Sequence, residues 1–536
     1  MALSRAELLV AILITLFKFL LIPAYYSTDF DVHRNWLAIT HNLPLSQWYQ
    51  EASSQWTLDY PPLFAWFEWI LSHAARLVDP SLVQLGVTSP PTPAGIFFHR
   101  LSVIASDVTL FLAASEWSGI FAGKHRKPWT VDHPSQVLFI LLVGNVGLLI
   151  VDHIHFQYNG FMLGVLLLSL AKIQQGRALS GALIFSVLLN LKHIFLYVAP
   201  AITLHLLCSY CFSDLQVKWR SFLPLRFLTL ASIVIAIFAV SFGPFIALGQ
   251  LPLVLSRLFP FGRGLCHAYW AANAWALYNT VDKGVAVLGS RLGLLDSTSH
   301  PHAAMTGGLV GEASHLVLPS ISPSISLLFS ILAMLPSLYR MWWVRREGLV
   351  CVRATAACAL SVFLFGWHVH EKAILLPILP LSILAIQSRA DAHVFLLISL
   401  PGHVALLPLI HTLPELPVKM ILTLMFSLYS YWSLTHLHRS GGPLLSWAEC
   451  FYLAGLAPLS FLPHVAPVFT WSRALPFLPL LITSAYCALG VIYGSFFLLI
   501  PSMNGGENLT SRRQRPNGKT APGLVIERGH KHKKDI

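Results

Sequence analysis

The stretch ELLVAILITLFKFLLIPAYYSTDFDVHRNW, residues 7–36, passes from an apolar run to a polar segment almost without a spacer. The run from Glu7 to Pro23 approaches the length of about 20 residues that a helix needs to cross a bilayer. Asp29 and Asp31 follow it directly, in a chain with only 23 acidic residues among 536. A charged group costs roughly 2.5–3.5 kcal/mol at the bilayer centre. Acids placed beside such a run therefore indicate a site at the membrane surface.

The composition is typical of a membrane protein. Hydrophobic residues make up 55% of the chain and charged residues 11%, whereas ordinary soluble domains are roughly 25% charged. Apolar stretches long enough to cross a bilayer recur throughout residues 1–500. The sequence therefore predicts an all-α polytopic membrane protein, with about 14 transmembrane helices in one domain, residues 1–500.

Residues 501–536 form a basic C-terminal segment. We expect a disordered tail rather than a nucleic-acid-binding surface, because no folded module surrounds these charges. The last four residues, KKDI, place Lys533 and Lys534 at the spacing of a dilysine signal, which coat proteins read in the cytosol to return proteins to the endoplasmic reticulum. The tail is therefore predicted to be cytosolic, on a protein of the endoplasmic-reticulum membrane.

Lysine and arginine predict which side each loop faces, because basic residues flank the cytosolic ends of membrane spans. With the N-terminus in the cytosol, the basic clusters at 124–127, 218–220 and 340–346 all fall on the cytosolic side, provided that residues 61–78 lie in the interface. Residues 25–98 then form a luminal first loop. Its many tryptophans predict interfacial helices with aromatic rings at the level of the lipid headgroups.

The opposite, luminal face receives most of the ionisable residues outside the basic clusters. A carboxylate there can remove a proton from a sugar hydroxyl, and cations beside aromatic rings suit the phosphate of a lipid. Asp29 is the candidate catalytic base. The candidate substrate-binding residues are Asp31, His33, Arg34, Asp59, Asp152, His153, His155, Lys192, Arg263, His370, Glu371 and Lys372.

Several of these residues also have a structural alternative. Asp29 and Asp31 follow an apolar helix and are suited to cap the next one. Arg263, in the stretch RLFPFGRGLCHAYW, can extend its charge to the interface along apolar neighbours. Glu371 and Lys372, in WHVHEKAILL, can form a luminal ion pair. The sequence alone leaves these alternatives open.

Two metal-binding patterns occur, and both are disfavoured. Asp29-Phe30-Asp31 spells the D-x-D of nucleotide-sugar enzymes, but no Rossmann-like pattern accompanies it. In DHIHFQYN, residues 152–159, the spacing of His153 and His155 does not place two imidazoles on one helix face. We therefore expect neither a metal nor a cofactor.

Arg100 and Asp107 are two further charges inside one apolar stretch. They lie seven residues apart, so a continuous helix would place them on the same face. The spacing predicts a structural ion pair between them.

Four motifs in order, TDFDVHRNW, LDYPP, DHIHFQYN and VHEKAIL, resemble the endoplasmic-reticulum glucosyltransferases that use dolichyl-phosphate glucose. These are polytopic enzymes of the GT-C class, and the resemblance runs across nearly the whole chain. Two branches of the family share the motifs. HRNWLAITHNLP and SRLFPFGRGLCHAYW are similar to the second branch, whose members add glucose to an already monoglucosylated oligosaccharide.

The resemblance implies a GT-C fold and an inverting transfer of glucose in the lumen, with Asp29 as the base because it matches the family's acid after the first span. It implies dolichyl-phosphate glucose as the donor, a dolichyl-pyrophosphate-linked oligosaccharide as the acceptor, membrane lipid as a partner, and no nucleic acid. The alternatives are an enzyme of the first branch, or a transporter, although no internal repeat of the kind that transporters show is apparent.

Overall fold

The computed structural model describes residues 3–86, 89–122, 133–214, 219–259, 264–267, 271–294, 315–344, 348–469 and 475–499. In these ranges the regular structure is helical, apart from two isolated β-bridges. The all-α prediction is confirmed for this part of the chain. Arg263 and the tail 501–536, with its dilysine pair, lie outside the described residues.

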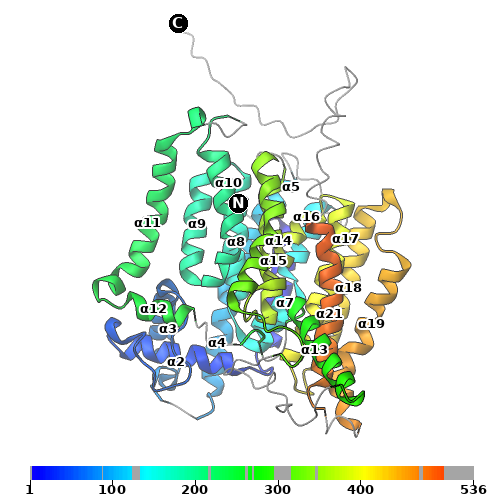
Figure 1. Cartoon of the computed structure of the whole chain (residues 1–536). Helices are drawn as coiled ribbons and strands as arrows, with labels where there is room; N and C mark the ends of the chain where they lie inside the picture. The colour runs from blue at the N-terminus through cyan, green and yellow to red at the C-terminus, as the bar shows by residue number, and fades with distance from the viewer. Residues whose placement is uncertain are drawn as a thin grey trace, which may run out of the picture.

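The first half of the chain, which includes Asp29, forms fifteen of the described elements. They are α1 (Arg5–Leu20), α2 (Thr28–Asn42), η1 (Leu45–Gln47), α3 (Pro62–Val78), η2 (Pro80–Val83), α4 (Pro93–Ser106), α5 (Val108–Ala122), α6 (Pro134–Val143), α7 (Val146–Leu148), the π-helical η3 (Leu149–Phe156), α8 (Asn159–Gln174), α9 (Ala178–Leu191), η4 (His193–Tyr197), α10 (Ala199–Tyr210) and η5 (Trp219–Ser221). α5 packs against α6 and α8, and α8 against α9. α2 and α3 pack together at one end of the bundle, at the lower left of the view (Figure 1).

The second half continues the bundle. Its elements are α11 (Pro224–Ala247), α12 (Leu251–Leu258), α13 (Ala274–Arg291), α14 (Pro323–Val344), α15 (Val350–Phe365), η8 (Glu371–Ile374), α16 (Leu375–Ala385), α17 (Arg389–Val404), η9 (Leu407–Leu409), α18 (Leu416–Leu437), η10 (Arg439–Gly441), α19 (Trp447–Val465), η11 (Ala466–Val468) and α21 (Leu478–Leu499). α14 packs against α15, α15 against α16, and α17 against α16 and α21. The buried side chains form one large apolar core that joins both halves.

Six helical stretches in the described ranges are long and apolar enough to cross a membrane. They are Pro93–Ala122, Pro134–Phe156, Pro224–Ala247, Pro323–Val344, Arg389–Leu409 and Leu478–Leu499. Four shorter apolar helices, α8, α9, α10 and α15, lie among them. The chain thus has several apolar helices, as a polytopic membrane protein requires. The total of about 14 spans stays a prediction.

The start of α2 shows which residue caps this helix. Ser27 is the N-cap, and its hydroxyl accepts the backbone N–H of Asp29 at 3.2 Å. Asp29 and Asp31 lie in the first turn, where carboxylates favour the positive end of the helix dipole. The capping alternative for the two aspartates is therefore wrong, and the Asp29 side chain is available for other contacts.

The predicted pair of Arg100 and Asp107 is wrong. Arg100 Nη2 donates to the carbonyl oxygens of Tyr25 at 2.8 Å and Ile154 at 2.7 Å, whereas Asp107 contacts Lys18 and His153. The reason is that seven residues are two helical turns, about 10.5 Å along the axis, and each side chain has nearer partners from other elements. Arg100 instead ties the segment before α2 to the π-helical η3.

Candidate active site

Asp29 is the point at which three of the four motifs meet. Lys372 Nζ lies 2.5 Å from Asp29 Oδ2, and Gln157 Nε2 donates to the same oxygen at 2.7 Å. His155 Nδ1 lies 3.3 Å from it. The Asp29 side chain is 24% exposed, so it is held by the protein on one side and open on another.

Ser27 and the end of η3 hold the two motifs together. The Ser27 hydroxyl donates to the carbonyl oxygen of His155 at 2.8 Å and lies 2.8 Å from His155 Nδ1, while the Ser27 N–H donates to the same carbonyl at 3.0 Å. The next residue, Phe156, has a φ of 88°, a left-handed conformation that is uncommon for a bulky side chain. Such conformations persist where the surroundings enforce them, and they cluster at functional sites.

The charges around Asp29 keep it ionised. Burial alone would raise the pKa of Asp29, but the positive charge of Lys372 and the hydrogen bonds of His155 and Lys372 outweigh it and hold the pKa well below its usual value. The carboxylate can therefore accept a proton at neutral pH. It is a weak base while Lys372 remains on it, and a stronger one when Lys372 moves away.

Lys192 is a second cation beside this group. In the turn after α9, its Nζ lies 3.4 Å from Asn159 Oδ1 and 3.5 Å from Gln157 Oε1, and 4.8 Å from the centroid of the Tyr60 ring. Burial, with the charge of Lys372, lowers the pKa of Lys192 to about 8, against the opposing effect of nearby carboxylates that include Asp59. The predicted Asp59 and Lys192 thus belong to the same polar group as Asp29.

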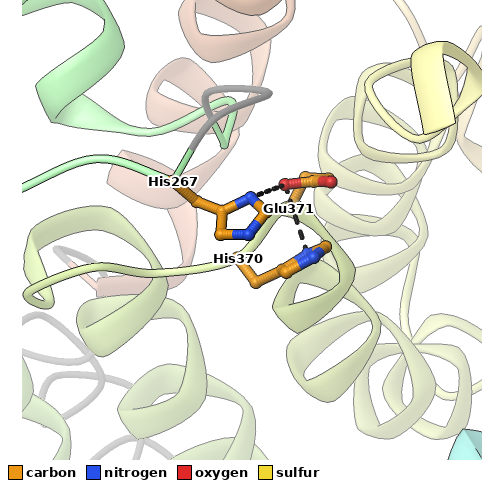
Figure 2. Close-up of side chains that lie close together, drawn as sticks. All are labelled: His267, His370 and Glu371. Atoms are coloured by element: carbon orange, nitrogen blue, oxygen red, sulfur yellow. Dashed lines mark ion pairs between the residues drawn. The ribbon is translucent and has the colours of Figure 1, made fainter. Parts of the chain in front are cut away.

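His267, His370 and Glu371 form a neighbouring trio (Figure 2). Glu371 is 1% exposed, and its Oε2 lies 3.4 Å from His267 Nδ1 and 3.2 Å from His370 Nδ1. The two rings are 4.0 Å apart between centroids. A β-bridge between Cys266 and Val369 holds the two loop segments together.

The trio is the group in the described ranges that has the spacing of a metal site, with one ligand atom per residue inside 4.8 Å. Two imidazoles and a carboxylate suit a divalent transition metal. However, His370 Nδ1 faces Glu371 and already accepts the backbone N–H of Lys372 at 3.2 Å. A metal on this nitrogen would have to displace that hydrogen bond. The expectation that no metal is needed stays a prediction.

Several predicted residues make contacts within the fold instead of with the Asp29 group. His33 is buried against Glu68 at 2.6 Å, which joins α2 to α3. Arg34 donates to the carbonyl oxygen of Ser89 at 2.8 Å. Asp31 lies two residues along α2 from Asp29, so its side chain points in a different direction.

Two members of the DHIHFQYN motif also have structural contacts. Asp152 accepts hydrogen bonds from Asn159 Nδ2 at 2.9 Å and Gly160 N at 2.5 Å, at the start of α8. His153 points to Asp107, at 2.8 Å. The substrate-binding roles of these residues stay predictions.

Three side chains of the site are not among the candidate catalytic and substrate-binding residues predicted from the sequence. Gln157 and Asn159 lie inside a quoted motif, but a search for charged residues does not select a neutral amide. His267 lies in the quoted stretch RLFPFGRGLCHAYW, one hundred residues from its partners. The sequence signal that they share is closeness to a predicted site residue. Gln157 and Asn159 follow His155, and His267 follows Arg263, in each case within four residues.

Comparisons with known proteins agree with the four motifs. A model of the ALG6, ALG8 glycosyltransferase family matches residues 14–499. The chain is similar to the Mus musculus dolichyl pyrophosphate Glc1Man9GlcNAc2 alpha-1,3-glucosyltransferase, with 52% identity over 485 residues, 90% of this chain and 92% of the relative. It is 44% identical over 494 residues to the Arabidopsis thaliana protein of the same name, covering 89% of this chain and 94% of the relative. A probable enzyme of this name from Drosophila melanogaster is 43% identical over 500 residues, covering 91% and 93%.

Proposed function

The chain belongs to the ALG6, ALG8 glycosyltransferase family, and we propose that it transfers glucose in alpha-1,3 linkage to a monoglucosylated, dolichyl-pyrophosphate-linked oligosaccharide. The names of the relatives, at up to 52% identity over most of the chain, support this acceptor and linkage. The donor is dolichyl-phosphate glucose. The enzyme has a GT-C fold in the endoplasmic-reticulum membrane, with Asp29 on the luminal side.

The transfer is a single displacement with inversion. The acceptor hydroxyl oxygen attacks C1 of glucose, and the bond from C1 to the phosphate oxygen breaks, with its electron pair leaving on dolichyl phosphate. The hydroxyl proton passes to the Asp29 carboxylate. The observation that carries this mechanism is an ionised carboxylate, partly open and bordered by Lys372 and His155.

The cations stabilise the leaving group. A departing phosphate needs compensation of its charge more than it needs an acid. We assign this task to Lys372 and His370 in the described part of the site, and to Arg263 outside it. Burial, together with the charges of His267 and Lys372, lowers the pKa of His370 well below its usual value. Nδ1 of His370 is taken up by the backbone N–H of Lys372 and by Glu371 Oε2, so we assign Nε2 as the nitrogen that meets a phosphate oxygen.

Lys372 has two roles in this scheme. Its ammonium nitrogen lies 2.5 Å from Asp29 Oδ2. The negative charge of a bound donor phosphate would attract this ammonium group away from Asp29. Moving to the phosphate would free Asp29 and strengthen it as a base. Donor binding and activation of the base would then be the same event.

The test is transfer by the purified full chain in detergent or nanodiscs. The protein is supplied with dolichyl-phosphate glucose and with either the glucose-free or the monoglucosylated acceptor, and mass spectrometry detects an added hexose. We expect product from the monoglucosylated acceptor alone. Product from the glucose-free acceptor alone would assign the chain to the first branch of the family, and no product from either would contradict the proposal.

A further inference from the structure

The contacts of Asp29 are unequal between its two carboxylate oxygens. Lys372, Gln157 and His155 all contact Oδ2, at 2.5, 2.7 and 3.3 Å. Among the described residues, Oδ1 has no hydrogen-bond partner, and the side chain is 24% exposed. We infer that Gln157 is a positioning residue that holds Asp29 by Oδ2, so that Oδ1 is the oxygen that accepts the acceptor's proton. This inference rests on the proposed function.

Gln157 is the partner best suited to hold Asp29 throughout the reaction. Lys372 is a cation that a donor phosphate would attract. His155 makes a longer contact, and its Nδ1 also lies 2.8 Å from Ser27 Oγ. Gln157 is neutral, so a phosphate does not compete strongly for it. Its hydrogen bond to Oδ2 therefore persists when Lys372 leaves.

Lys192 fixes the orientation of the Gln157 amide. The amide oxygen Oε1 lies 3.5 Å from the Lys192 ammonium, while Nε2 faces the Asp29 carboxylate. Turning the amide over would place its NH2 against a cation and its oxygen against an anion. The two charges thus select one orientation, in which Gln157 can only donate to Asp29.

The backbone at Gln157 is fixed on both sides. Gln157 follows Phe156, whose φ is 88°, and it precedes α8, where buried Asp152 binds Asn159 at 2.9 Å and Gly160 N at 2.5 Å. The Gln157 side chain therefore extends from a constrained turn. A carboxylate held in this way is aimed before the acceptor arrives, which lowers the cost of alignment.

The experiment compares Gln157→Ala and Gln157→Glu in the purified full chain. We expect Gln157→Ala to lower kcat about 10- to 100-fold, because misplacing a reacting group by about 1 Å can cost 100-fold. The KM values for donor and acceptor should change less than about threefold, since Gln157 contacts the base and not the substrates. The acid limb of the kcat profile should move to higher pH, because a lost hydrogen bond to the ionised form raises the pKa of Asp29.

Gln157→Glu is nearly isosteric and places a like charge beside Asp29, so its acid limb should move further than that of Gln157→Ala. The matched control is Gln175→Ala. Exposed Gln175 also donates to a carboxylate at 2.7 Å, that of Glu116 in α5, and it lies at the opposite end of α8 from Asn159. We expect wild-type kcat and an unmoved acid limb for this control.

Three results would overturn the inference. The first is wild-type kcat with an unmoved acid limb in Gln157→Ala, and the second is raised KM values with unchanged kcat in the same variant. The third is a kcat of the control Gln175→Ala that falls as far as that of Gln157→Ala. If Gln157→Ala does not give a monodisperse protein, Gln157→Glu decides on the same criteria. Asp29→Asn separates this failure from that of the proposed function. An inactive Asp29→Asn beside a fully active Gln157→Ala rejects the positioning role alone, whereas an active Asp29→Asn rejects the base itself.

Discussion

The molecule contains the same trio of side chains twice, once open and once closed. The trios are Asp29 with Lys372 and His155, and Asp107 with Lys18 and His153. Each aspartate lies 2.5 Å from its lysine, but the Asp29 side chain is 24% exposed and the Asp107 side chain 2%. In both trios the lysine and the histidine lie against Oδ2 of the aspartate.

The two trios differ at the other oxygen. Asp107 Oδ1 faces Gly160, where even an added Cβ would collide with it. Asp29 Oδ1 has no hydrogen-bond partner among the described residues, and we propose that it receives the substrate's proton. Ionisable groups in a membrane protein are taken as functional by default, yet the Asp107 trio is fully enclosed and joins α1, α4 and η3. Charge types alone therefore do not separate the two trios, whereas the exposure of the carboxylate does.

The first prediction concerns Asp29→Asn, which removes the base and keeps the shape. A positioned base contributes about 10²–10⁴ in rate, so turnover should fall by that factor. The thermal unfolding midpoint should stay near that of the wild type, because the side chain is partly exposed and the amide keeps the volume. Turnover and scanning fluorimetry on the same purified sample check both expectations. Normal turnover would remove Asp29 from the mechanism.

Asp107→Asn should reverse this pattern. It leaves Lys18 buried without a carboxylate, and removing one partner of a buried pair costs about 3–5 kcal/mol. We expect a lower unfolding midpoint and a lower yield, with turnover per folded molecule within about threefold of the wild type. A loss of turnover at an unchanged midpoint would show that the closed trio also takes part in the chemistry.

The residues of the Asp29 trio could be predicted from the sequence, whereas the pairing within the Asp107 trio could not. Asp29 and Lys372 were predicted because charged residues in apolar surroundings stand out, and the four motifs fixed their family. His33 and His153 stood out for the same reason, yet they pair with Glu68 and Asp107, residues far away in the chain. Local sequence does not say which charges meet. The predicted Arg100–Asp107 pair failed because both side chains have partners from other parts of the chain, which the spacing does not reveal.

Lys372→Ala tests the mobile partner of the open trio. A hydrogen bond to a charged group contributes about 1.5–3 kcal/mol, so the donor KM should rise roughly 10- to 100-fold. The pKa of Asp29 should also rise, because the main charge that lowers it is removed. Donor titrations at several pH values check this. Lys18→Ala, the matching change in the closed trio, should affect the unfolding midpoint and leave the donor KM unchanged.

The smallest expected effect is a decline of kcat/KM for the donor at high pH, caused by the loss of charge on Lys192. Its nearest polar contacts are amide oxygens, at 3.4 and 3.5 Å, and burial lowers its pKa to about 8. A lysine loses its charge as pH rises through its pKa, so kcat/KM for the donor should decline above about pH 8, by less than about tenfold. Lys192→Arg keeps the charge at all these pH values and should flatten the decline. Lys192→Met should give a lower value with no limb, and a decline that persists in both variants would assign the limb to another group.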